Sequence, residues 1–172
     1  MHPAGTQHAP LYTREQRKRR DASAWTLVQG VLAPLQFVVF LISLVLVLRF
    51  LLTGEGLAAA TASIVLKTLL LYTIMVTGSI WEKVVFDKYL FAAPFFWEDV
   101  FSMLVLALHT AYLAALVGGF LTPHQQIWLA LAAYAAYVIN AAQFLLKLRR
   151  ARLDQQAQAD REEPAIMVEY AQ

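Results

Sequence analysis

The sequence predicts an all-α integral membrane protein, an up-down four-helix bundle with both termini in the cytoplasm. Of its 172 residues, 59% are hydrophobic and only 15% are charged, which is too apolar for the large surface of a soluble domain of this size. The apolar residues form four runs long enough to cross a bilayer, which takes about 20 residues per helix. The connections between these runs are short, so neighbouring helices must be antiparallel.

Each run has recognisable ends. The expected spans are, in order, Trp25–Leu52, Leu57–Phe86, Phe95–Phe120 and Gln125–Leu148. Glycines in the segment 53–56 suit a tight turn between the first two spans, and the glycine pair near residue 118 does the same for the last two. We therefore expect one membrane domain over residues 25–152, between polar tails at 1–24 and 153–172.

Positive charge sets the expected orientation. Basic residues cluster before the first span, after the last span and in the central connection, and they are Arg14, Arg17, Lys18, Arg19, Arg20, Lys83, Lys88, Lys147, Arg149, Arg150 and Arg152. The positive-inside rule places these three regions in the cytoplasm. The basic blocks favour contact with anionic lipid over nucleic acid, so we expect the lipid bilayer as a partner and no nucleic acid.

The chain contains no cysteine. This excludes disulfides, thiol catalysis and cysteine-ligated metal centres. Chemistry at a buried site must therefore come from carboxyl, imidazole, amine and hydroxyl groups.

Carboxyl groups are concentrated where the second span leads to the third. Glu82 ends one span, and Glu98 and Asp99 begin the next, so all three are expected at the cytoplasmic boundary of the hydrocarbon. Desolvation disfavours the ionised form of a carboxyl group, which suits it to proton donation, while a better solvated neighbour acts as base. The alternative is a salt network in which these groups only pair with Lys83 and Lys88.

Aromatic residues crowd the same connection, among them Trp81, Phe96 and Trp97. Aromatic side chains at this depth ordinarily form an interfacial belt. Their position around the acidic residues also suits a flat, polycyclic ligand that enters from the membrane.

A second polar level is expected near the middle of the bilayer. His109 lies roughly 16 Å deeper than Glu98 on about the same helix face, and Tyr72 lies at a similar depth. Lys67 is costly in an apolar helix, and it either reaches the outer headgroups, pairs within the bundle or holds an anionic or carbonyl-bearing ligand. His109 is either a hydrogen-bonded residue between helices or an axial ligand of a chelated metal.

Four segments carry a resemblance to a known family. They are Leu11–Arg17, Trp25–Phe37, Tyr72–Phe86 and Phe95–Val100, of which the Trp-Glu-Lys and Phe-Trp-Glu-Asp motifs are the most specific. The chain resembles the bacteriochlorophyllide 3-vinyl hydratase family of bacteriochlorophyll biosynthesis, from about Leu11 to Arg152. The resemblance implies a lyase of a bacterial inner (cytoplasmic or intracytoplasmic) membrane that hydrates the 3-vinyl group of a chlorophyllide or bacteriochlorophyllide. It implies no cofactor or metal beyond the magnesium that the substrate carries.

For such a reaction we expect carboxyl general acid–base catalysis. The candidate catalytic residues are Glu82, Glu98, Asp99 and His109, and the candidate substrate-binding residues are Trp81, Lys83, Lys88, Phe96, Trp97, Lys67 and Tyr72. His109 is the candidate axial ligand of the substrate's magnesium. A non-catalytic pigment carrier or photosystem assembly factor is the alternative function, and candidate protein partners are further copies of the chain and other pigment-biosynthesis enzymes.

Overall fold

The computed structural model describes residues 11–170, with side chains described as far as Leu153 and at Gln156. Within this range helices joined by short turns and loops make up the chain, and there is no strand. Its elements are α1 (Arg14–Ala22), α2 (Ala24–Thr53), α3 (Leu57–Phe86), the 3-10 helix η1 (Ala93–Phe95), α4 (Phe96–Gly118) and α5 (Pro123–Tyr170). The all-α prediction is confirmed, and four of the helices are long and apolar enough to cross a membrane.

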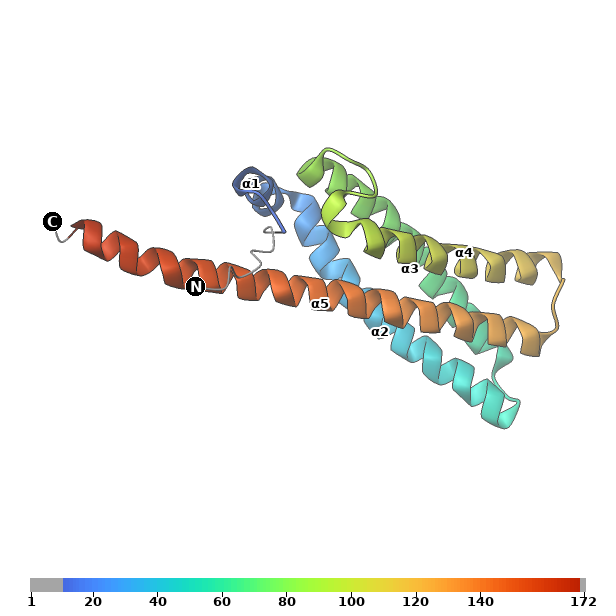
Figure 1. The fold of residues 1–172 in the computed structure, drawn as a ribbon. Coiled ribbons are helices and arrows are strands. Elements are labelled where there is room, and N and C mark those ends of the chain that lie inside the picture. The colour runs from blue at the N-terminus through green and yellow to red at the C-terminus, as the bar shows by residue number, and fades with distance from the viewer. Residues whose placement is uncertain (1–10, 171–172) are drawn as a thin grey trace, which may run out of the picture.

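The helices form two antiparallel hairpins, α2 with α3 and α4 with α5 (Figure 1). Both hairpin turns lie at the same end of the molecule, and the α3–α4 connection lies at the other end. In the first turn Gly54 and Gly56 adopt left-handed backbone angles, which glycine reaches without steric cost. The four spans begin and end close to the predicted positions, because long apolar runs bounded by glycines determine them.

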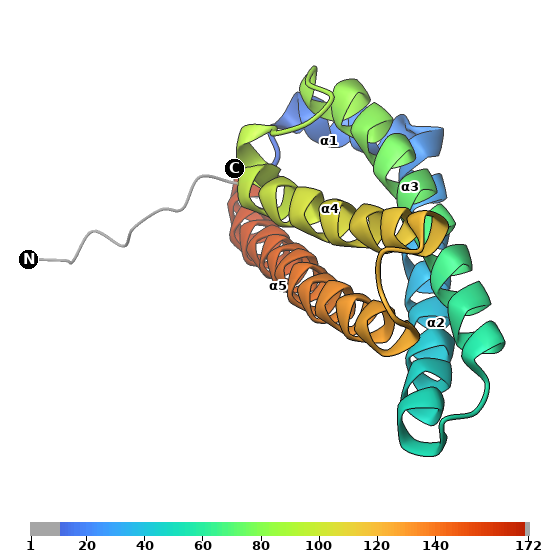
Figure 2. The same ribbon diagram turned by 90° about the vertical axis from the view of Figure 1, so that its right-hand side faces the viewer.

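A short helix, α1, lies within the segment that the sequence predicts as a polar tail. Thr13 caps it through a capping box with Gln16, which satisfies two otherwise unpaired backbone N–H groups. The preceding residue, Tyr12, is buried and stacks on Phe86, with the ring of Phe95 also in contact. Figure 2 shows α1 beside the end of α3, which is where these contacts hold it.

The last helix also extends beyond its predicted span. α5 begins at Pro123 and continues to Tyr170, through the segment expected as a C-terminal tail. Residues 123–153 account for its membrane-length apolar part. Near its start, His124 packs against Phe50 of α2, with ring centroids 5.4 Å apart.

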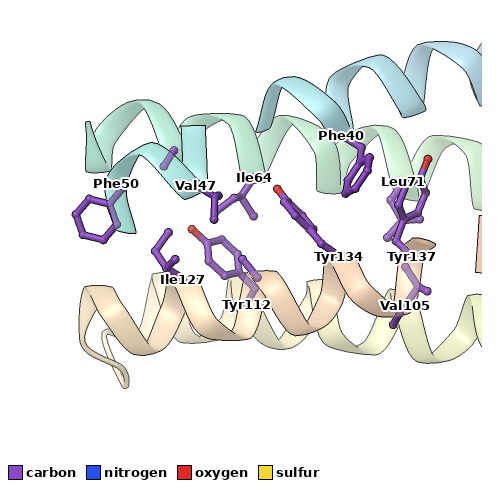
Figure 3. Packing of buried hydrophobic residues seen from close by; sticks show 13 residues of the cluster. Phe40, Val47, Phe50, Ile64, Leu71, Val105, Tyr112, Ile127, Tyr134 and Tyr137 are labelled. Carbon is purple, nitrogen blue, oxygen red and sulfur yellow. The ribbon is translucent and has the colours of Figure 1, made fainter. Parts of the chain in front are cut away.

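The core lies where the two hairpins meet (Figure 3). Phe40 of α2 contacts the rings of Tyr134 and Tyr137 of α5 at centroid separations of 5.4 and 5.0 Å. Towards the hairpin turns the same core contains Val47, Ile64, Tyr112 and Ile127. This packing fixes the rotation of each helix and so determines which polar side chains face inward.

Candidate functional site

Inward-facing polar side chains gather at two depths. We call the group at the α3–α4 connection the connection layer, and it consists of Glu82, Glu98, Asp99 and Lys147. We call the group in the middle of the helices the central layer, and it consists of Ser43, Ser63, Lys67, His109 and Tyr134. All of these residues except Ser63 and Lys147 are buried.

Two carboxyl groups of the connection layer face each other. Glu82 near the end of α3 and Asp99 in the first turn of α4 are only 6% and 3% exposed, and their carboxyl groups are close enough to interact electrostatically. Each also accepts a backbone N–H from the loop between the helices. Asp99 Oδ2 lies 2.7 Å from the nitrogen of Phe91, and Glu82 Oε2 lies 3.3 Å from that of Ala92.

The loop reaches this geometry through an unusual backbone conformation. Phe91 has a φ of 59°, in the left-handed region that a bulky side chain rarely adopts. This conformation accompanies the hydrogen bond from its N–H group to Asp99. Backbone strain of this kind persists only where surrounding contacts enforce it, which is common at functional sites.

The third carboxyl group has a different partner. Glu98 Oε2 forms an ion pair with the ammonium group of Lys147 on α5, 2.5 Å away. The same ammonium group donates to the carbonyl of Pro94 and lies 5.1 Å from the centre of the Phe95 ring. The charge of the Glu98 carboxylate is therefore balanced by an ammonium group, which distinguishes it from the Glu82–Asp99 pair.

The predicted aromatic residues divide into two groups. Trp81 is partly buried against Phe86 and Phe95, and its indole N–H donates to Thr26 of α2. Phe96 and Trp97 contact each other edge to face, but they point outward, and Trp97 is 67% exposed. Only the second group presents free aromatic surface next to the carboxyl groups.

The two predicted lysines of this connection are also placed differently. Lys83 bonds to the carbonyl and carboxylate of Asp87, at 3.0 and 3.4 Å. Lys88 is exposed, and its ammonium group is not part of any ion pair among the described residues.

In the central layer Lys67 turns inward and does not reach the outer headgroups. It is fully buried, its Nζ lies 2.9 Å from His109 Nε2, and no carboxylate in the described part of the chain pairs with it. The aromatic rings of Phe40, Tyr134 and Tyr137 surround the ammonium group, with the centre of the Tyr137 ring at 4.1 Å. Aromatic faces attract a cation and so offset part of its cost here.

Both ring nitrogens of His109 are engaged. Its Nδ1 donates to the carbonyl of Val105 at 2.8 Å, so Nε2 carries the lone pair that accepts from Lys67. Axial ligation of a metal through Nε2 would require Lys67 to give up this contact. Tyr72, predicted at the same depth, instead bonds to Thr110 at 2.8 Å and is not part of the central layer.

Sequence comparison identifies the family to which these residues belong. The sequence profile of the 2-vinyl bacteriochlorophyllide hydratase family matches residues 12–150. This chain belongs to the 2-vinyl bacteriochlorophyllide hydratase family. The resemblance stated from the sequence motifs is thereby confirmed, and the matched range contains every residue of both layers.

Two curated members of the hydratase family are close relatives. The 2-vinyl bacteriochlorophyllide hydratase of Cereibacter sphaeroides is 72% identical over 151 residues, which cover 87% of this chain and 93% of that protein. The 2-vinyl bacteriochlorophyllide hydratase of Rhodobacter capsulatus is 68% identical over 151 residues, which cover 88% of each chain. No solved structure matches the chain. Family membership makes the chain an enzyme, a hydro-lyase, and gives no support to a non-catalytic pigment carrier.

Several residues of this hydratase-family site were missed from the sequence. Lys147 is one of four basic residues that follow the last span, and all four were interpreted only as signals of membrane orientation. Tyr134 and Ser43 looked like ordinary residues of apolar helices. A depth count on α5 would have placed Lys147 level with Glu98, but the aromatic cage depends on helix rotation. In the part of the chain described here, no three His, Asp or Glu side chains come close enough together to hold a metal ion.

Proposed function

We propose that this chain adds water to the vinyl substituent of a chlorophyllide or bacteriochlorophyllide, giving the 1-hydroxyethyl pigment, and that Glu82 and Asp99 carry the proton transfers. The relatives' names specify the hydration of such a vinyl group, numbered 2 there and 3 in the alternative numbering of the macrocycle. The observation that carries the assignment is the convergence of two buried carboxyl groups at the α3–α4 connection, where they accept the backbone N–H groups of two adjacent residues.

Two carboxyl groups in contact repel each other when both are ionised, so they are best held as one acid and one carboxylate. The acid gives its proton to the terminal vinyl carbon, and the electron pair of the double bond forms the new C–H bond. The carbon next to the ring becomes cationic, and the neighbouring carboxylate stabilises it. Water then bonds to this carbon and returns a proton to the carboxyl pair, so the step is redox-neutral.

Glu98 has a supporting role in this proposal. Its ion pair with Lys147 fixes the first turn of α4 against α5, and so holds Asp99 in place. Because its carboxyl group is already bound to the Lys147 ammonium group, Glu98 is a positioning residue, and Glu82 or Asp99 is the proton donor.

The pigment would lie against the exposed aromatic face of the connection. Phe96 and Trp97 present apolar rings within three residues of Asp99, and Phe91, whose N–H group bonds to Asp99, presents a third. Lys88 is exposed nearby and suits a propionate carboxylate as a point charge. The site at the central layer is less suited, because Lys67 and His109 already satisfy each other and, among the described side chains, no carboxyl group bonds to either.

We further propose that the four spans form an up-down bundle in the bacterial inner membrane, with the connection layer on the cytoplasmic side. The basic residues at both ends of the chain and in the central connection support this orientation. No cofactor is required, because acid, base and water supply the whole reaction.

The test compares carboxamide substitutions at the three carboxyl positions, with conversion of vinyl pigment followed by absorbance. Glu82→Gln and Asp99→Asn should each lower kcat by about a hundredfold or more, the usual contribution of a general acid or base. Glu98→Gln should retain much more activity. Asp87→Asn is the matched control, since this exposed carboxylate lies on the same connection but outside the pair. Near-normal turnover by properly inserted Glu82→Gln and Asp99→Asn proteins would refute the assignment.

A further inference from the structure

Buried carboxamide groups occupy a level that the proposed reaction leaves unexplained. Gln36 of α2 is only 2% exposed, and neither its Oε1 nor its Nε2 has a hydrogen-bond partner among the described residues. Asn140 Oδ1 and Gln143 Oε1, both on α5, are buried and unpartnered in the same way. Nearly all buried polar groups in folded proteins bond to protein or to ordered water, so these four atoms call for a ligand.

Helix register places Gln36 and Asn140 at one depth. Phe40 of α2 packs against Tyr137 of α5, and the two helices run in opposite directions (Figures 1 and 3). One helical turn in the same direction leads from Phe40 to Gln36 and from Tyr137 to Asn140. The unpartnered groups of α2 and α5 therefore lie within the same cross-section of the helices.

This level lies between the two layers. On one side, the rings of Phe40 and Tyr137 flank the Lys67 ammonium group. On the other side, Asn140 Nδ2 donates to Ser102 Oγ at 2.8 Å. Ser102 lies one helical turn from Asp99 on the buried face of α4. Asn140 is thus connected, through Ser102, to the helical turn that carries Asp99.

We propose that Gln36, Asn140 and Gln143 bind ordered water, and that this internal site supplies the water molecule added to the substrate. A buried water typically makes about three hydrogen bonds, and the unpartnered amide atoms of Gln36 and Asn140, with that of Gln143 about one turn further along α5, provide them. Glu82 and Asp99 are only 6% and 3% exposed, and the bound pigment would cover their exposed side, so the reacting water would come from the interior. The inference rests on the proposed function. One water is consumed per product, with its oxygen on the ring-adjacent carbon and one proton returned to the pair.

The kinetic test replaces an amide by an apolar side chain of similar size. Gln36→Leu should lower kcat about tenfold, as expected when one hydrogen bond to the reacting water is lost. The KM for the pigment should not change, because Gln36 is buried in the interior and is not part of the exposed aromatic face where we place the pigment. Gln29→Leu is the matched control, since Gln29 is on the same helix and its amide bonds to Thr77 at 2.7 Å. Unchanged kcat together with higher thermal stability in Gln36→Leu would show a dry, unpaired amide and overturn the proposal.

A second measurement detects the water without relying on activity. Brief X-ray exposure makes hydroxyl radicals from bound water, and mass spectrometry identifies the side chains that they modify. Tyr137 should be modified in the unsubstituted protein and protected in Gln36→Leu/Asn140→Leu. An unmodified Tyr137 alongside an inactive Glu82→Gln would overturn the water site and leave the carboxyl assignment intact. Water-dependent modification alongside fully active Glu82→Gln and Asp99→Asn would overturn only the catalytic role of the water.

Discussion

The ammonium group of Lys67 lies 2.9 Å from His109 Nε2, and both side chains are completely buried. One residue comes from α3 and the other from α4, so the contact joins the two helical hairpins. Each group is costly in an apolar interior, and each offsets part of the cost of the other.

Removing only one member of this pair should destabilise the protein. His109→Leu leaves Lys67 with aromatic rings alone, and the expected loss is about 1–3 kcal/mol. The double variant Lys67→Met/His109→Leu should be more stable than the sum of the two single changes predicts, because neither polar group remains unpaired. Thermal unfolding in detergent, followed by circular dichroism, measures both effects.

The control for this pair is Tyr72→Phe, which removes a part-exposed hydrogen bond to Thr110 between the same two helices. Its cost should be about 1 kcal/mol or less. Strictly additive losses for the Lys67 and His109 substitutions would contradict a direct interaction between them.

A second prediction concerns the ion pair between Glu98 and Lys147. Lys147→Met leaves Glu98 buried without its counter-charge, so the protein should lose about 1–3 kcal/mol of stability and part of its activity. Glu98→Gln/Lys147→Met should recover much of the stability, because it removes the unpaired charge. Lys88→Met, which removes an exposed lysine from the same region, should leave stability unchanged. Failure of the double variant to exceed Lys147→Met would count against this account.

A third prediction concerns the attachment of α1. Tyr12→Ala removes a ring that packs on Phe86 and Phe95, so α1 should detach and its arginines should become sensitive to trypsin. Tyr12→Phe keeps the ring and should behave like the unsubstituted protein. Tyr89→Ala, at an exposed aromatic residue of the α3–α4 connection, is the control for a general loosening. Equal cleavage rates in Tyr12→Ala and Tyr12→Phe would show that the ring does not hold α1.

These residues also show how far the sequence leads. The four spans and the meeting of Glu82 with Asp99 at one boundary were predictable, because apolar length sets the spans and a short connection brings their ends together. The partner of each carboxyl group was not predictable, since it depends on the rotation of α4 against α3 and α5. Lys67 shows the same limit. The energetic cost of burying its charge was evident from the sequence, but the three aromatic rings around it come from two other helices, α2 and α5.

The attachment of α1 was hidden for a different reason. Tyr12 is a single aromatic residue before a strongly basic segment, and a single residue has no periodicity that would indicate a buried face. Its burial depends on an aromatic cluster that α3, η1 and α5 assemble, with Phe86, Phe95 and Phe144 among its members. Such tertiary contacts override the local polar character of the segment.

The last prediction separates pigment binding from catalysis. Trp97 is 67% exposed and lies two residues from Asp99, so its ring is available to a flat ligand without being part of the carboxyl pair. Trp97→Ala should raise the KM for the pigment about fivefold to tenfold, as expected for the loss of one aromatic contact, and leave kcat nearly unchanged. Trp128→Ala is the matched control, because Trp128 is equally prominent on α5 near the opposite end of the spans. If both substitutions raise KM to the same extent, the effect reflects anchoring in the membrane; if Trp97→Ala lowers kcat alone, the ring contributes to the reaction and not to pigment binding.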